Sequence, residues 1–181
     1  MFSNNVFSLN SKLKSFKSKI KYVDAALFTL QETHATTKGK YFFEDFETFE
    51  AIRKNKEKGG TLIGAHKSLK PKLINEYEET FELLVIEINV ANKDIRVISG
   101  YGPQENWKPH KVMPFFLAIE EEIIKAELAG RSVIIEADFN SKLGPDFIPN
   151  DPKPISDNGK ILAGIIKRQK LTVVNGLVQC Q

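Results

Sequence analysis

Hydrophobic and polar residues alternate along several short stretches of the chain, as in β-strands with one buried face. The clearest stretch is 81–90, where Ile86 and Ile88 share one face. A tight turn at 91–93 would lead into a returning strand over 94–101 and complete a hairpin. Further strands are predicted at 25–30, 42–52, 61–65, 132–135 and 171–175.

Three other stretches repeat their apolar residues every three or four positions, which predicts helices. They run over 10–22, 114–128 and 160–170. Pro114 suits the first turn of the second helix, and Gly130 is placed to end it. Many strands mixed with a few helices predict an α+β domain, in which a sheet or a pair of sheets is flanked by helices.

Length and composition are those of one globular domain. The 181 residues are 41% hydrophobic and 27% charged, which excludes disordered and collagen-like chains. A net charge of +3 permits nucleic-acid binding without arguing strongly for it. Cys180 is the single cysteine, so an internal disulfide and a cysteine-based zinc site are excluded. Neither a membrane-spanning apolar run nor a signal-peptide pattern is found, so we expect an intracellular protein that is not secreted.

Polar side chains gather where predicted strands end. Glu32 follows an apolar run, and a carboxylate held there is the oxygen ligand that Mg²⁺ prefers. Asp138 could take a proton from water, and Asn140 could hold that water or a phosphate oxygen. Tyr101 could steady a phosphate oxygen or a leaving group. Taken singly, each residue also fits an ordinary loop or Asx-turn, and Tyr101 fits an aromatic packed on Pro103.

In combination, these segments resemble the motifs of the endonuclease/exonuclease/phosphatase superfamily. Asn5-Val6-Phe7-Ser8-Leu9 is similar to the first motif, and Leu30-Gln31-Glu32-Thr33-His34 to the metal-ligand motif. Residues 99–103 resemble the tyrosine motif, and 137–140 resemble the Asp-Phe-Asn motif, all in the family's order. Residues 59–63, 157–162 and 171–175 resemble the branch found in LINE-type retrotransposons.

The resemblance implies a single domain over 1–181, a four-layer α/β-sandwich with two packed mixed β-sheets flanked by helices. It implies a metal-dependent endonuclease that nicks DNA, with Glu32 holding Mg²⁺ or Mn²⁺. Asp138 and Asn140 would activate and orient the attacking water, Asn5 would support them, and Tyr101 would steady the phosphate. An active retroelement product would work in the nucleus, with a downstream reverse transcriptase domain in its polyprotein as a partner.

Three departures from the family pattern affect these expectations. Phe7 stands where many relatives have Asn or Asp, and Ala137 replaces the usual glycine. The Ser-x-x-Asp-His motif that ends the family's domain does not follow Asn175. We therefore expect a domain that lacks its C-terminal strands, is a very weak nuclease or none, and tends to associate through an unpaired sheet edge.

A basic segment is the candidate DNA-binding element. Arg53, Lys54 and Lys56 could neutralise phosphates, although a solvated charged loop explains the same pattern and Glu57 dilutes the charge.

Two other functions fit the same motifs. One is a phosphodiesterase or phosphatase acting on inositol phosphates or lipids, and the other is a non-catalytic nucleic-acid-binding remnant.

Overall fold

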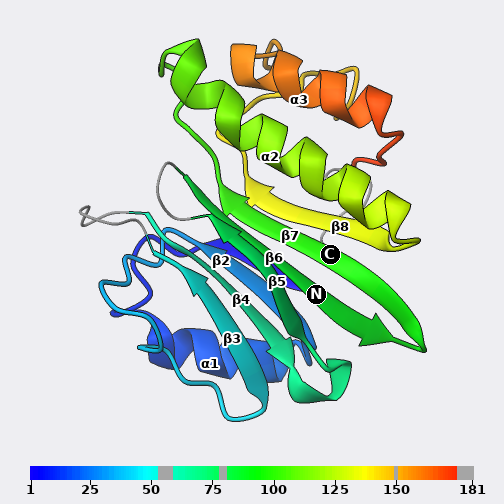
Figure 1. Cartoon of the computed structure of the whole chain (residues 1–181). Coiled ribbons are helices and arrows are strands. Elements are labelled where there is room, and N and C mark those ends of the chain that lie inside the picture. Colours follow the sequence, from blue (N-terminus) through cyan, green and yellow to red (C-terminus); the bar gives the residue numbers. More distant parts are fainter. Residues whose placement is uncertain (53–58, 78–80, 149–150, 175–181) are drawn as a thin grey trace.

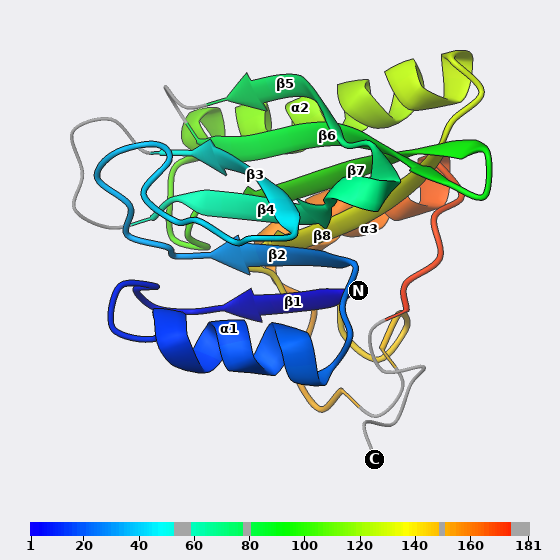
Figure 2. The same ribbon diagram turned by 90° about the horizontal axis from the view of Figure 1, so that it is seen from below.

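The computed structural model describes residues 1–52, 59–77, 81–148 and 151–174. Two four-stranded sheets pack face to face, with helices on the outer faces (Figures 1 and 2). Sheet A has the strand order β1-β2-β4-β3, and sheet B has the order β5-β6-β7-β8. The elements are β1 (Phe2–Asn5), α1 (Leu13–Tyr22), β2 (Leu27–Gln31), β3 (Phe46–Ala51), β4 (Thr61–His66), the 3₁₀ helix η1 (Lys67–Leu69), β5 (Lys72–Tyr77), β6 (Glu82–Val90), β7 (Lys93–Tyr101), α2 (Pro109–Leu128), β8 (Ser132–Asp138) and α3 (Asp157–Arg168).

Three apolar clusters bind the four layers together. Helix α1 covers the outer face of sheet A, and α2 and α3 cover the outer face of sheet B (Figure 1). Strand β6 is apolar on both faces: Leu83 and Val85 pack beneath the helices, while Leu84 and Ile86 pack against sheet A. Each such side chain contributes about 1.5–3 kcal/mol when fully buried. The expected four-layer sandwich of two mixed sheets is therefore confirmed.

The sheet topology brings four strand ends to one rim of the sandwich. Strands β1 and β2 are parallel, with Asn5 opposite Gln31, and β7 and β8 are parallel, with Tyr101 opposite Asp138. The carboxyl ends of parallel strands meet at the same edge of a sheet. The polar residues that end or directly follow these strands therefore come from both sheets.

Two helices start earlier than their sequence patterns predict. The helix predicted at 114–128 begins at Pro109, so Pro114 lies inside it and not in its first turn. Pro109 takes the early position that suits proline, where its missing N–H costs no hydrogen bond. The helix predicted at 160–170 begins at Asp157, because Ser156 caps it by accepting from the backbone N–H of Gly159.

The strand predictions were wrong at three places. Residues 171–174 do not form the strand predicted at 171–175, so β8 is the last strand among the described residues. Leu171 instead closes the end of α3, because its N–H donates to the carbonyl of Ile166 at 2.9 Å. Strands β1 and β5 were not predicted.

None of the helices in the described part of the chain has the length and apolar character needed to cross a bilayer.

Candidate active site

All five side chains that the sequence singled out for catalysis and metal binding meet at the rim where β1, β2, β7 and β8 end. Asn5 is the link between the sheets: its Nδ2 donates to Glu32 Oε1 at 3.1 Å and to Asp138 Oδ2 at 3.0 Å. Tyr101 donates its hydroxyl to the same oxygen of Glu32 at 2.8 Å. One amide and one phenol therefore hold carboxylates from two different sheets next to each other.

Asn140 is fixed on the opposite side of Asp138. Its backbone N–H donates to Asp138 Oδ1 at 3.1 Å, and its Nδ2 donates to the carbonyl of Gly102 at 2.8 Å. Both oxygens of Asp138 therefore accept a hydrogen bond, which sets the orientation of the carboxylate.

The loops at this rim have an unusual backbone. Left-handed φ angles are rare for residues other than glycine and cost about 1–3 kcal/mol each. Backbone bonds hold them, among them Ser8 N–H to Glu32 O at 2.8 Å and His34 N–H to Gly59 O at 2.9 Å. The non-glycine residues with positive φ at the rim are Phe7 (45°), Ser8 (77°), Glu32 (55°), His34 (52°) and Asn140 (46°). Strain of this kind gathers where geometry is needed for function.

Gly102 allows the loops that follow β7 and β8 to touch. A Cβ atom at this position would lie 2.9 Å from the carbonyl oxygen of Phe139 and 3.0 Å from that of Asp138. The backbone N–H of Gly102 donates to the Asp138 carbonyl at 2.7 Å. Any larger residue would separate Tyr101 from Asp138.

Buried polar side chains join the sheets one layer beneath the site. Gln31 of β2 donates to Ser99 Oγ of β7 at 3.4 Å, and Thr61 of β4 meets the same hydroxyl at 3.4 Å. All three side chains are almost fully buried. Because polar groups in a core must be paired, this contact restricts how sheet A can sit on sheet B.

Tyr101 remains a hydrogen-bond donor at all ordinary pH values. Burial is the main cause that raises its pKa to about 12, and the hydrogen bond and charge of Glu32 add to the effect, while Asn140 opposes it. A phenol that stays protonated can donate to Glu32 or to an oxygen of a bound phosphate.

The two site carboxylates are not neutralised by lysine or arginine among the described residues. Among the described residues, the basic group that lies near them is the His34 imidazole, whose Nε2 is 3.9 Å from Glu32 Oε2 and forms an ion pair only when the ring is protonated. No group of three or more His, Cys, Asp or Glu that could hold a metal occurs in the part of the chain that the structure describes. Mg²⁺, however, is commonly held by one or two carboxylates together with water and substrate phosphate. The oxygen donors of Glu32 and Asp138 fit that mode of binding.

Sequence reasoning missed two further residues at the site. His34 packs its ring at 5.6 Å from that of Phe7, and its Nε2 is buried without a hydrogen-bond partner among the described residues. Gln104 donates to the Tyr101 hydroxyl at 3.2 Å. His34 stood in a quoted motif and could have been found, whereas nothing around Gln104 marks it. A pocket of about 260 Å³ beside the site is lined by Phe7, Glu32, Gly59, Tyr101, Gly102, Gln104 and Trp107.

The basic segment with Arg53, Lys54 and Lys56 lies outside the described residues, so its relation to the site stays a prediction.

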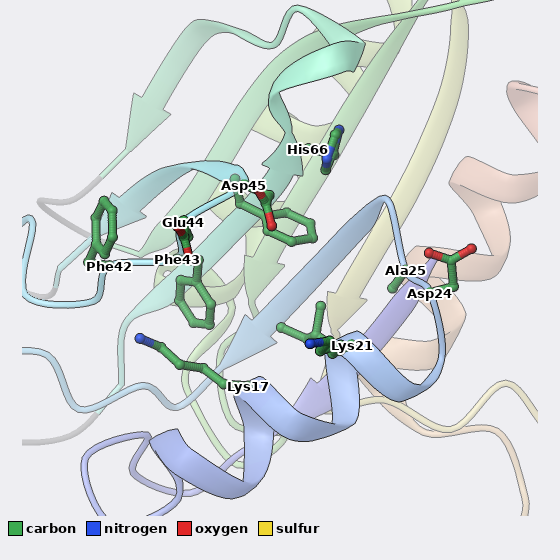
Figure 3. Close-up of a pocket in the computed structure, with 11 residues that line it drawn as sticks. Lys17, Lys21, Asp24, Ala25, Phe42, Phe43, Glu44, Asp45 and His66 are labelled. Atoms are coloured by element: carbon green, nitrogen blue, oxygen red, sulfur yellow. The ribbon is translucent and has the colours of Figure 1, made fainter.

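A larger pocket of about 440 Å³ is separate from the site (Figure 3). Lys17 and Lys21 of α1 line it opposite Glu44 and Asp45, so its charges are mixed. Its residue Ala25 precedes β2, whereas Glu32 follows that strand. A five-residue strand separates its two ends by roughly 17 Å.

Comparisons with known proteins agree with this architecture. No protein-family model matches the chain, and no curated protein matches it. The solved endonuclease domain of TRAS1, a telomere-specific non-LTR retrotransposon, is similar with a TM-score of 0.62 and 17% identity, covering 92% of this chain and 68% of that one. AP endonuclease LMAP from Leishmania major has a TM-score of 0.74 and 13% identity, with coverages of 93% and 66%. A 3′ phosphatase from Neisseria bound to a product DNA hairpin has a TM-score of 0.63 and 16% identity, with coverages of 92% and 69%.

At these identities the likeness shows the fold alone. The chain shares its fold with these solved structures and spans about two thirds of their length.

Proposed function

We propose that this chain is an endonuclease domain that hydrolyses DNA phosphodiester bonds with the help of Mg²⁺ or Mn²⁺. One observation carries the proposal: Asn5, Glu32, Tyr101, Asp138 and Asn140 form one hydrogen-bonded cluster in which neither carboxylate pairs with lysine or arginine among the described residues. Such a cluster has room for a cation and for the phosphate that the cation would attract.

Each side chain has a role that its surroundings support. Asp138 takes the proton of the attacking water, and the two hydrogen bonds to its oxygens keep it aimed at that water. Asn140 orients the same water or a phosphate oxygen, and Tyr101 donates to the phosphate as its charge grows. A divalent cation held by Glu32 would supply charge neutralisation on the phosphate and the departing oxygen.

DNA is the substrate that the comparisons favour. One similar structure is the endonuclease domain of a non-LTR retrotransposon, another is an AP endonuclease, and a third is bound to a DNA hairpin. The segments resembling LINE-type sequence support a retrotransposon origin, with work in the nucleus and a reverse transcriptase domain in the parent polyprotein.

We expect the turnover of this domain to be low. Among the described residues, none of the hydrogen bonds to Glu32, Tyr101, Asp138 or Asn140 comes from a lysine or an arginine. With no cationic side chain bonded to these four residues, the charge on the phosphate would be neutralised mainly by the cation, the phenol and the amides, and a missing donor commonly costs about 100-fold in rate.

Nicking of supercoiled plasmid tests the proposal. The wild-type chain should convert plasmid to open circles with Mg²⁺ and not with EDTA. Asp138→Asn should lower the rate by about 100-fold or more, because it removes the proton acceptor and keeps the shape. Absence of metal-dependent nicking would refute the proposal. Phosphate release from phosphoinositides in place of nicking would support the phosphatase alternative, and DNA binding without any turnover would support a non-catalytic remnant.

Arg53, Lys54 and Lys56 are proposed to contact the DNA backbone. Changing all three to alanine should weaken DNA binding and lower the slope of log affinity against log salt by about 3. Unchanged affinity and slope would remove this segment from the DNA-binding surface.

A further inference from the structure

The first turn of α3 lies against both loops that carry site residues. Asn158 is 2% exposed, and its Nδ2 donates to the carbonyl of Pro103 at 3.0 Å and to the carbonyl of Asn140 at 3.3 Å. Pro103 follows Tyr101 by two residues, and Asn140 is itself a site residue. One amide nitrogen therefore spans the gap between the end of β7 and the end of β8.

The residues next to Asn158 hold the start of α3 against the segment that follows Asn140. Ser156 exchanges two hydrogen bonds with Lys142: its N–H donates to the Lys142 carbonyl at 3.0 Å, and its Oγ accepts from the Lys142 N–H at 3.1 Å. A Cβ atom at Gly159 would lie 1.9 Å from the carbonyl oxygen of Lys142, so only glycine permits this approach. The helix start is thus fixed to the segment that follows Asn140.

Support for Asn140 matters because its backbone lies in a sparsely populated region. Its φ of 46° is in the left-handed region, which asparagine adopts more readily than other residues apart from glycine but which is still uncommon. The bond from Asn158 reaches the Asn140 carbonyl, while the Asn140 side chain reaches the Gly102 carbonyl at 2.8 Å. Asn158 therefore acts on both the backbone and the neighbouring loop of Asn140.

Asparagine is suited to this task for a chemical reason. Its amide nitrogen carries two N–H groups in a rigid plane and can donate to two carbonyls at once. Serine offers one donor, and an ionised aspartate offers none.

We propose that Asn158 is a positioning residue that sets the distance between the Tyr101 loop and Asn140, and thereby the place of the Asn140 amide in the site. Measuring this role through enzyme activity depends on the proposed nuclease function. Asn158 does not touch the substrate, so its loss should lower kcat and leave KM largely unchanged.

The test compares Asn158→Ala and Asn158→Asp with the wild-type chain in plasmid nicking and in hydrogen–deuterium exchange. Both variants should lower kcat by about 10-fold or more, with KM within about 2-fold. Exchange at 138–143 should become faster in both variants, while β2 and β6 keep their wild-type protection.

Ile165→Val is the matched control, because Ile165 is buried in the same helix about two turns beyond Asn158. It should lower the melting temperature while kcat and the exchange of 138–143 stay at the wild-type level. Wild-type kcat in Asn158→Ala, or a loss of protection spread evenly over the chain, would overturn the inference. If the wild-type chain does not nick DNA, the proposed function fails, and local exchange alone decides the role of Asn158.

Discussion

Two clusters in this molecule are built from the same side chains and differ in how their charge is balanced. In each, a tyrosine and an asparagine donate to one oxygen of a glutamate. At the rim, Tyr101 and Asn5 donate to Glu32 Oε1 at 2.8 and 3.1 Å. Beneath α2, Tyr77 and Asn75 donate to Glu122 Oε1 at 3.0 and 3.2 Å. Burial is the main cause that raises the pKa of both tyrosines to about 12, and the nearby glutamate adds to it.

The difference lies in the cations. Glu122 pairs with Arg96 at 3.4 Å and with Lys125 at 3.1 Å, so we call this group, with Asn75 and Tyr77, the closed cluster. Burial alone would raise the pKa of Glu122, but the hydrogen bonds that it accepts outweigh burial and hold the pKa below its usual range.

The group of Asn5, Glu32, Tyr101 and Asp138 has no lysine or arginine partner among the described residues, and we call it the open cluster. In the closed cluster, Arg96 and Lys125 neutralise the carboxylate of Glu122. At the rim, no lysine or arginine of the described residues neutralises the carboxylates of Glu32 and Asp138.

The strongest test of the closed cluster is Arg96→Met. Arg96 is 7% exposed, and its removal leaves the buried Glu122 and also Glu87 with one cation fewer each. The free energy of unfolding should fall by about 3–5 kcal/mol, because breaking a buried pair leaves an uncompensated charge. Urea unfolding measures this, with the more exposed Lys125→Met as the control at less than about 1 kcal/mol. A loss as small as that of the control would show that the closed cluster is not a stabilising group.

The paired variants Tyr101→Phe and Tyr77→Phe should separate the two clusters. Tyr101→Phe should slow nicking by about 100-fold with little change in stability, because it removes a donor to the phosphate. Tyr77→Phe should lower the free energy of unfolding by about 1–2 kcal/mol and leave the nicking rate unchanged. Plasmid nicking and urea unfolding of both proteins provide the measurement, and equal behaviour of the two would contradict the distinction.

Mg²⁺ should raise the free energy of unfolding of the protein by binding to the open cluster and not to the closed cluster. At a Mg²⁺ concentration ten times its Kd, the free energy of unfolding should rise by about 1.4 kcal/mol, since the ion binds only the folded state. Glu32→Gln should abolish this gain, whereas Tyr77→Phe should keep it. Thermal unfolding with Mg²⁺ and with EDTA measures the effect. Stabilisation that survives Glu32→Gln would place the cation elsewhere.

The smallest effect concerns alkaline pH. The folded-state pKa of Tyr77 and of Tyr101 is about 12, above the unfolded value near 10. The stability contributed by the protonated phenols is complete below pH 10 and is lost as the pH rises towards 12. In an ultraviolet titration, Tyr77→Phe and Tyr101→Phe should each remove one phenol that ionises late. A phenol that ionises at the ordinary pH would contradict the burial described for that cluster.

Much of the fold could be read from the sequence because buried strands leave a clear pattern. Strand β6 is apolar on both faces, and β7 follows it after a short turn, so the hairpin was predicted closely. Strands β1 and β5 were missed because both lie at sheet edges and carry mostly exposed side chains. An edge strand pairs on one side only, and it needs few apolar residues.

The candidate site could be predicted only in part. Glu32, Tyr101 and Asp138 could be placed at strand ends from local pattern, but their meeting in space depends on two parallel pairings that no local pattern contains. The resemblance to a family supplied that step. The contact of Asn158 with both loops could not be predicted, because its two acceptors are backbone carbonyls. Every residue has such a carbonyl, so the sequence does not mark these two.

The two sheets follow one another along the chain, and this affects the order in which the molecule is made. Sheet A is complete at His66, and sheet B begins at Lys72. The bond from Asn5 to Asp138 spans 133 residues. A ribosome adding about 5–20 residues per second takes roughly 7–27 s to cover that interval. The N-terminal half can therefore emerge and pair its strands while Asp138 is still untranslated, and the open cluster is assembled only when the second half docks onto the first.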